Sequence, residues 1–191
     1  MNQKYIVLTI VTTPIDTDQL LKKTPEEKQK LINPIDSMII GIGIRYQEKN
    51  IIFSNQNEKE ILNKFWEEWK NIKKDKPAIP TIGFNINNFD IPFLVGRSYI
   101  NNIKIYPFSL KEIIDIRQKI QAYKPGKTRG KLKEYGDILG ITINIDNNQI
   151  PNLYKNKNFD KINEYIDKTL ELIDSMYKRA QETNIIKINK Y

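Results

Sequence analysis

Apolar residues along this chain follow two patterns, one typical of buried strands and one typical of helices that pack on a core. Short runs rich in Ile, Val and Thr predict strands at 4–13, 37–45 and 51–54. Apolar residues spaced three and four apart predict helices at 57–73, 110–121, 131–139 and 159–181. The Asn-rich residues 142–156 predict a loop with one short strand. This order of elements predicts an α/β domain that begins with a three-stranded meander.

The segment 81–94, TIGFNINNFDIPFL, combines the two patterns. Its first four residues predict a strand, the asparagines that follow predict a turn, and the apolar residues after them predict a helix. Asp90 is the one acid inside this apolar run. Pro92 fits the first turn of a helix, so Asp90 falls near the helix N-terminus, where exposed amides favour a carboxylate.

This segment resembles the second exonuclease motif of the 3′–5′ proofreading domain of family B DNA polymerases. The family pattern is close to G-Y-N-I-x-x-F-D-x-P-Y-L, and its Asp is a metal ligand. The GFNI run, the FD pair, the Pro and the final aromatic-Leu keep their spacing here. The alternative interpretation is a buried strand-to-helix joint in which Asp90 only caps the helix.

The resemblance implies the ribonuclease H-like, or DnaQ-like exonuclease, fold and extends over about residues 4–180. In this fold a central mixed sheet, with its first three strands antiparallel, is flanked by helices. Residues 1–191 are therefore expected to form a single domain with its core at 4–180. We expect an insertion at 14–35 and a flexible, polar tail at 184–191.

The other two exonuclease motifs depart from the family pattern. The first, roughly Y-I-V-F-D-I-E-T-T, aligns with residues 5–13, so that Thr9 and Val11 stand where the family has Asp and Glu. The third aligns with the last long helix, where Tyr165 is retained but Thr169 replaces the metal-binding Asp. A shifted register that uses Asp167 instead breaks the apolar face of the helix.

The missing acids bear directly on catalysis. The family hydrolyses phosphodiesters with two Mg²⁺ or Mn²⁺ ions held by clustered carboxylates. Only Asp90 of the four expected acids remains, a weak metal ligand at most, so we expect no bound cofactor and negligible hydrolysis. The alternative hypothesis is an active, metal-dependent exonuclease whose site is rebuilt with other acids, for which the candidates are Asp16, Asp18 and Asp167.

Composition points to a polyanionic partner. The 191 residues carry a formal net charge of +8, with neither Cys nor His, which excludes disulfides, zinc sites of those residues and histidine chemistry. Coding bias toward Lys is the alternative explanation. The leading hypothesis is a single-stranded DNA-binding protein, accessory to replication or repair. It would bind strands or 3′ ends through a catalytically inactive exonuclease fold. The expected contacts are Asn85, Phe89, Arg97, Lys124, Lys127, Arg129, Lys131 and Tyr165.

Several of these contacts have a simpler explanation. Phe89 and Tyr165 could equally be core residues, and the cationic loop 123–133 could be a solvated surface connection. A third hypothesis is a protein-interaction scaffold for a polymerase that has lost nucleic-acid binding. No run approaches the roughly 20 apolar residues of a membrane span, and no signal-peptide pattern is present, so an intracellular, cytoplasmic location is expected.

Overall fold

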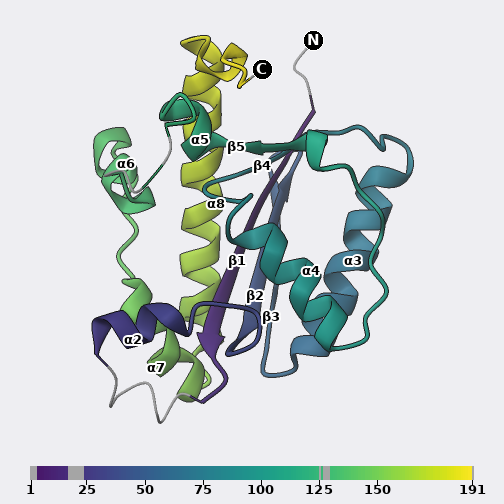
Figure 1. The fold of residues 1–191 in the computed structure, drawn as a ribbon, viewed down its shortest axis with the longest axis vertical. Helices are drawn as coiled ribbons and strands as arrows, with labels where there is room; N and C mark the ends of the chain where they lie inside the picture. The colour runs from purple at the N-terminus through teal and green to yellow at the C-terminus, as the bar shows by residue number, and fades with distance from the viewer. Residues whose placement is uncertain (1–3, 17–23, 125, 127–129, 191) are drawn as a thin grey trace.

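A mixed sheet forms the centre of the protein in the computed structural model, which describes residues 4–16, 24–124, 126 and 130–190. Within these residues the strand order is β3-β2-β1-β4-β5 (Figure 1). β1 pairs antiparallel with β2, and β2 pairs antiparallel with β3, whereas β4 and β5 continue the sheet in parallel. The strands are β1 Ile6–Pro14, β2 Ser37–Tyr46, β3 Lys49–Ser54, β4 Thr81–Gly83 and β5 Ile113–Asp115. The expected fold class is confirmed.

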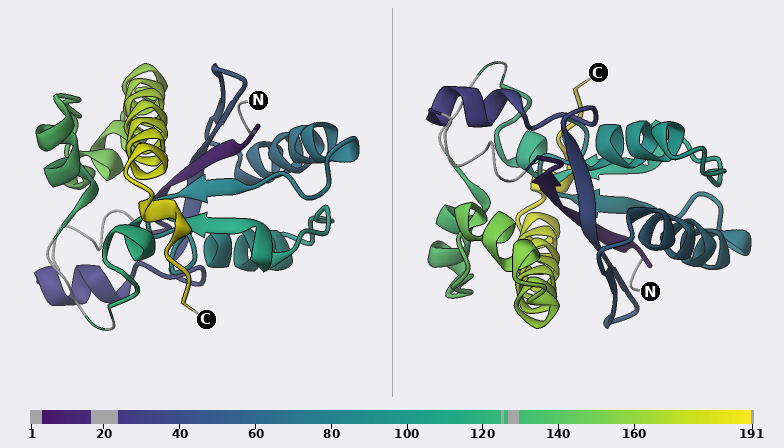
Figure 2. Two further views of the ribbon diagram at one scale, coloured as in Figure 1. Left: turned by 90° about the horizontal axis from the view of Figure 1, so that it is seen from above. Right: turned by 90° about the horizontal axis from the view of Figure 1, so that it is seen from below.

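Helices cover both faces of the sheet (Figures 1 and 2). α3 and α4 pack on one face, against the side chains of Ile6, Leu8 and Ile10 from β1. α5, α6, α7 and α8 lie on the other face, where Val7 and Val11 of β1 point. This alternation follows from the two-residue period of a strand that is buried on both sides. The helices are α2 Pro25–Lys30, α3 Glu58–Lys74, α4 Asp90–Ile100, α5 Ile116–Ile120, α6 Leu132–Leu139, α7 Ile150–Lys155 and α8 Phe159–Glu182.

Close contact between α8 and the sheet depends on two glycines of β2. A Cβ atom built on Gly41 would lie 2.7 Å from the Ile166 side chain, and one on Gly43 would lie 2.3 Å from it. Both glycines face β1, opposite Val11 and Thr9 respectively. The missing side chains therefore let α8 lie directly over the middle of β1.

Two segments differ from the sequence-based expectation. The predicted helix at 110–121 is divided into a 3-10 turn at Leu110–Glu112, the strand β5 and the short helix α5, because residues 113–115 pair in parallel with β4. The segment 142–156, expected as a loop with one short strand, instead holds a 3-10 turn at Asn147–Gln149 and the helix α7. At residues 113–115 a tertiary contact therefore decides the local structure.

Within the segment predicted to be a flexible tail, the structure has a 3-10 turn, which contacts α8 and α5. This turn, at Ile185–Lys187, places two isoleucines, Ile185 and Ile186, against the apolar core on the α8 side. The buried Lys119 ammonium also donates a hydrogen bond to the Ile188 carbonyl. No helix in the described ranges has the length and apolar character that a bilayer crossing requires.

Candidate functional site

The four exonuclease motif positions come together where β1 lies between α4 and α8. Thr9 shares the face of β1 that carries Val7 and Val11, toward α8. On the α4 side, the Asp90 Oδ1 atom accepts a hydrogen bond of 2.9 Å from the Ile10 backbone N–H. The pKa of the Tyr165 hydroxyl is raised, first by burial and also by the nearby charge of Asp90. The structure thus brings the motif residues of distant segments into one region.

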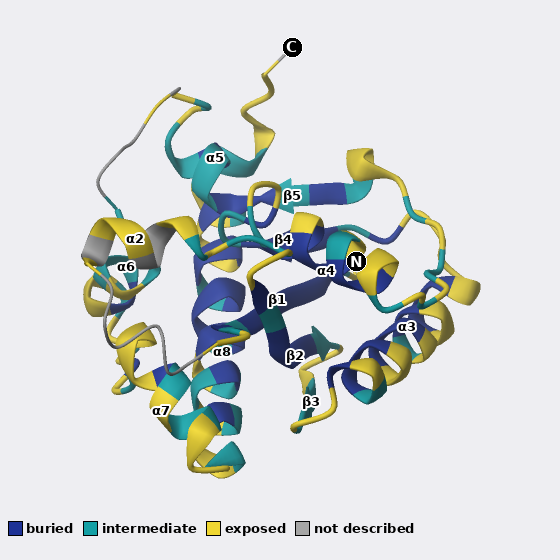
Figure 3. Ribbon diagram, turned by 60° about the horizontal axis from the view of Figure 1, so that its bottom comes forward, coloured by how far each residue is buried: buried dark blue, intermediate teal, exposed yellow. Residues whose placement is uncertain are grey.

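This region is closed to solvent. Thr9, Val11, Asp90 and Thr169 expose only between 2 and 8% of their surface. Figure 3 shows β1 in the colour of buried residues in the middle of the molecule. Val11 belongs to an apolar cluster that includes Ile143 and Ile150, so α7 and the segment before it cover the strand. The region is therefore packed as core.

The replaced positions have roles within the fold. The Thr169 hydroxyl donates a 2.8 Å hydrogen bond to the Tyr165 carbonyl one helical turn earlier. This proton therefore forms a hydrogen bond within α8. Val11 packs within the apolar cluster just described. Neither residue supplies an anionic oxygen, and the hydroxyl of Thr9 is neutral.

Asp90 compensates for the short length of β4. That strand pairs with β1 only at Ile6 and Val7, so the N–H of Ile10 lies beyond its end and the Asp90 carboxyl takes the place of a strand partner. Burial raises the pKa of Asp90 to about 7, against the opposing effect of this N–H, and the charge of Asp115 adds to the increase. The carboxyl therefore carries less than its full negative charge near neutral pH.

The two-metal site of active exonucleases does not fit these residues. Across residues 4–16, 24–124, 126 and 130–190, no three acidic side chains cluster in a way that could hold a metal ion. Asp167 accepts a 2.6 Å hydrogen bond from the amide of Asn50 on β3, two strands away from β1. Asp16 is exposed beyond the end of β1, and Asp18 lies outside the described residues.

A second buried acid, Asp115, has a structural role that the sequence pattern did not predict. Its carboxyl accepts backbone hydrogen bonds from Asn85 and Asn87, in the turn after β4, at 2.9 and 3.3 Å. It also accepts the N–H groups of Arg117 and Gln118, at 3.0 and 3.3 Å, as the N-cap of α5. An Asp between a β-rich tripeptide and a helix is the signal that identifies such a cap. Burial raises the pKa of Asp115 in spite of these four donors.

Three predicted nucleic-acid contacts lie around the closed region. Asn85 adopts a left-handed backbone conformation, with φ of 60°, and its side-chain oxygen accepts a hydrogen bond from Asn88. Phe89 is partly buried, with its ring 4.8 Å from that of Phe93. Tyr165 is also partly buried, and its hydroxyl donates a 2.6 Å hydrogen bond to Asn147. Each therefore has a structural contact as well as an accessible part.

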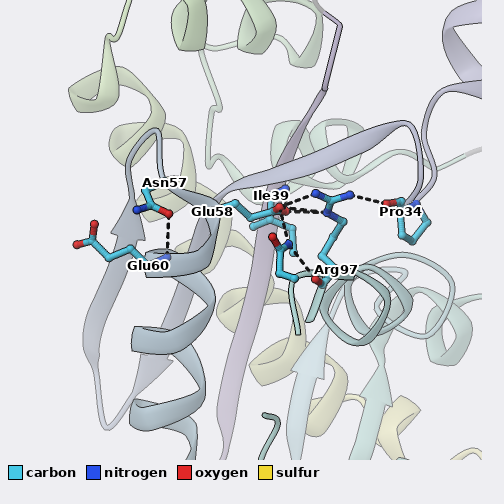
Figure 4. A network of polar contacts seen from close by, with 7 residues as sticks. Pro34, Ile39, Asn57, Glu58, Glu60 and Arg97 are labelled. Carbon is cyan, nitrogen blue, oxygen red and sulfur yellow. Dashed lines mark hydrogen bonds and ion pairs between the residues drawn. The ribbon is translucent and has the colours of Figure 1, made fainter. Parts of the chain in front are cut away.

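Arg97, an expected nucleic-acid contact, is buried inside the protein. Its buried guanidinium forms an ion pair with the buried Glu58, through Nε at 2.9 Å and Nη2 at 2.6 Å (Figure 4). Its Nη1 donates to the Pro34 carbonyl at 2.8 Å. Glu58 also accepts the Ile39 N–H, so the pair joins α3, α4, β2 and the loop before β2. Arg97 is a structural residue because its donors already have partners inside the protein.

Two of the four predicted loop cations can be placed. Lys124 and Lys131 are exposed, on either side of the loop between α5 and α6. Both flank helices on the α8 face of the sheet. Lys127 and Arg129 lie outside the described residues.

The comparisons with known proteins identify a family, a relative and a fold. The family model described as DNA polymerase family B, exonuclease domain, matches residues 3–139. An uncharacterized protein of Methanocaldococcus jannaschii is 30% identical over 169 residues, which cover 81% of this chain and 92% of that protein. The family B DNA polymerase of the hyperthermophilic archaeon Pyrobaculum calidifontis matches the structure with a TM-score of 0.71 over 97% of this chain, at 11% identity. This chain spans 25% of that polymerase, so this last match concerns the fold. The chain belongs to the family of DNA polymerase B exonuclease domains.

Proposed function

We propose that this protein binds single-stranded DNA, including 3′ ends, and does not cleave it. The observation that carries the proposal is the state of the motif region, where one buried carboxyl stands among Thr9, Val11 and Thr169. Hydrolysis by this family requires several carboxylates, because two divalent cations must be held next to the scissile phosphate. A single acid that is hydrogen-bonded to Ile10 cannot offset four positive charges.

Electrostatics support retention of binding. The formal net charge is +8, which attracts a phosphate backbone over a distance of about a Debye length. Replacement of the acids also removes negative charge that would repel phosphates bound beside this region. Exposed Lys124 and Lys131 are available to contact phosphates, and the accessible parts of Phe89 and Tyr165 are candidates for stacking on bases.

The proposal extends to a role as an accessory to DNA replication or repair. A family B polymerase is the natural neighbour for such a protein, since the family contains domains that act on the same 3′ ends. The alternative of a rebuilt, active exonuclease gains no support from Asp167, because that carboxyl accepts a hydrogen bond from Asn50 on the edge strand β3.

Removing the charges of Lys124 and Lys131 together is expected to weaken binding of a fluorescent single-stranded oligonucleotide. If each lysine contacts one phosphate, the slope of log affinity against log salt becomes shallower by about 1.4. Fluorescence anisotropy titrations at several salt concentrations measure this slope for the wild type and for the Lys124→Ala, Lys131→Ala double variant.

The matched control removes two exposed lysines of α3, Lys70 and Lys74, and so gives the same net charge. α3 lies on the opposite face of the sheet from α8. An equal loss in both double variants would mean that net charge alone governs binding, and it would refute a specific role for the loop. No measurable affinity in the wild type would refute the proposed function itself.

A further inference from the structure

The outward face of α4 carries no charge. The helix contains two charged residues, Asp90 and Arg97, and both point inward and are buried. Its solvent side presents Val95, Tyr99 and Ile100, and Tyr99 is 86% exposed. Charged residues make up 28% of the whole chain. An exposed helix face that contains none of them is therefore unusual for this protein.

The loop before β2 continues this apolar surface. Ile35 is 72% exposed, and the neighbouring Pro34 is held against α4 by the Arg97 hydrogen bond. A Cβ atom on Gly96 would lie 2.9 Å from the Pro34 ring, so loop and helix are in direct contact. The loop is folded around Asn33, whose side-chain oxygen accepts the N–H groups of residues 35 and 36. It is a defined part of the surface.

The end of β1 lies beside the same loop, because the Ile15 N–H donates to the Asp36 carbonyl at 2.9 Å. Six exposed apolar residues therefore come from three adjoining segments. We name this surface the α4 face, and its residues are Ile15, Ile32, Ile35, Val95, Tyr99 and Ile100.

The area of the α4 face is suited to an interface. A tyrosine alone offers roughly 150–250 Å², and the six residues together present several hundred Å². The largest apolar patch on a typical monomer is roughly 300–600 Å² and is often functional. Two copies that each cover such a face approach the roughly 1,200 Å² at which specific interfaces begin.

Charge favours a second copy as the occupant. Two molecules of net charge +8 repel each other, and this repulsion is smallest where no lysine has to be buried between them. The six residues of the α4 face are uncharged, and the exposed charged residues within two positions of them in the chain, Asp16, Lys30 and Asp36, add no net positive charge. A two-fold axis lets the same patch serve both partners, which is the commonest arrangement of soluble dimers.

We propose that two copies of this protein associate through the α4 face into a two-fold symmetric dimer. Tyr99 is the largest and most exposed residue of the face, so it is expected to contribute most to the affinity. α4 packs on the face of the sheet opposite α8. Dimerisation is therefore tested separately from the proposed DNA binding.

Sedimentation over a concentration series up to about 100 µM tests the proposal on the full chain. The wild type is expected to shift from 22.5 kDa toward twice that mass. Tyr99→Lys places two positive charges in the symmetric interface and is expected to raise the dissociation constant by at least about tenfold. The control is Ile138→Lys, because Ile138 is also well exposed, at 71%, on α6 outside the α4 face.

The salt dependence of the dimer distinguishes apolar association from electrostatic binding. Raising salt from about 0.05 to about 0.5 M screens the repulsion between the copies, so the dimer should persist or strengthen. A wild type that stays monomeric at the highest concentration would overturn the proposal. A dimer that Tyr99→Lys leaves unchanged, or that Ile138→Lys weakens equally, would also overturn it, because the interface would then lie elsewhere.

Discussion

Replacing Asp90 with Asn is expected to stabilise the protein at about pH 8 by roughly 1–3 kcal/mol. Asn keeps the shape of the side chain and an oxygen that can accept the Ile10 N–H. It removes the carboxylate charge, which burial makes unfavourable. The same burial raises the pKa of Asp90 from 3.8 to about 7. The buried charge, and not the hydrogen bond, is therefore the costly part of this residue at alkaline pH.

The pH dependence follows from the direction of that shift. Because the folded-state pKa is above the unfolded one, the folded protein binds the proton more tightly. This contribution to stability is fully present below about pH 4 and is lost as the pH rises through about 7. The difference in stability between Asp90→Asn and wild type should therefore grow from about pH 5 to about pH 8 in the same direction.

Urea unfolding of both proteins at each pH measures this difference and cancels the titration of all other groups. Asp90→Ala is the matched control, because it removes the charge but leaves the buried Ile10 N–H without a partner. It should be less stable than Asp90→Asn at every pH. A loss of stability in Asp90→Asn at alkaline pH would show that the carboxylate is kept as a metal ligand. The same conclusion would follow if Mn²⁺ raised the melting temperature of the wild type but not that of Asp90→Asn.

The Arg97→Ala variant is expected to lose about 3–5 kcal/mol of stability. The change leaves the Glu58 carboxylate buried without its cation and the Pro34 carbonyl without its donor. Arg97→Lys keeps the charge but cannot reproduce the paired contacts of the guanidinium, so it should fall between Ala and wild type. Urea unfolding at neutral pH measures all three proteins.

An exposed ion pair provides the control for this prediction. Lys64 and Glu60 lie one turn apart on α3, with their charged groups 2.6 Å apart and largely exposed. Lys64→Ala should cost far less stability than Arg97→Ala, because water screens this pair. Similar losses in Arg97→Ala and Lys64→Ala would mean that the buried network does not join the elements as described. In that case Arg97 would again be a candidate for DNA contact.

The parts of the fold that could be predicted have long, regular apolar patterns. β1 to β3, α3 and α8 were recognised because each combines length with one clear period. β5 was missed because its three residues, Ile113–Asp115, lie inside a longer apolar run that also fits a helix. Its parallel pairing with β4 depends on contacts between residues about 30 positions apart, which no local pattern contains.

The site was predictable in part for the same reason. Asp90 keeps the spacing of a recognisable motif, and the structure places it at the start of α4 as expected. The inward direction of Arg97 could have been inferred, since it follows the buried Phe93 by four residues on the same helix face. The contact between Tyr165 and Asn147 could not, because it depends on how the segment before α7 crosses α8.

The central claim, binding without cleavage, is tested most directly with a labelled single strand incubated first in EDTA and then in Mn²⁺. Affinity is measured in both conditions, and the recovered strand is resolved on a sequencing gel. The account predicts an intact strand and a salt-sensitive affinity that is the same with and without metal. A ladder of shortened products that appears only with Mn²⁺ and disappears in Asp90→Ala would contradict it, and would mean that other side chains complete a working metal site.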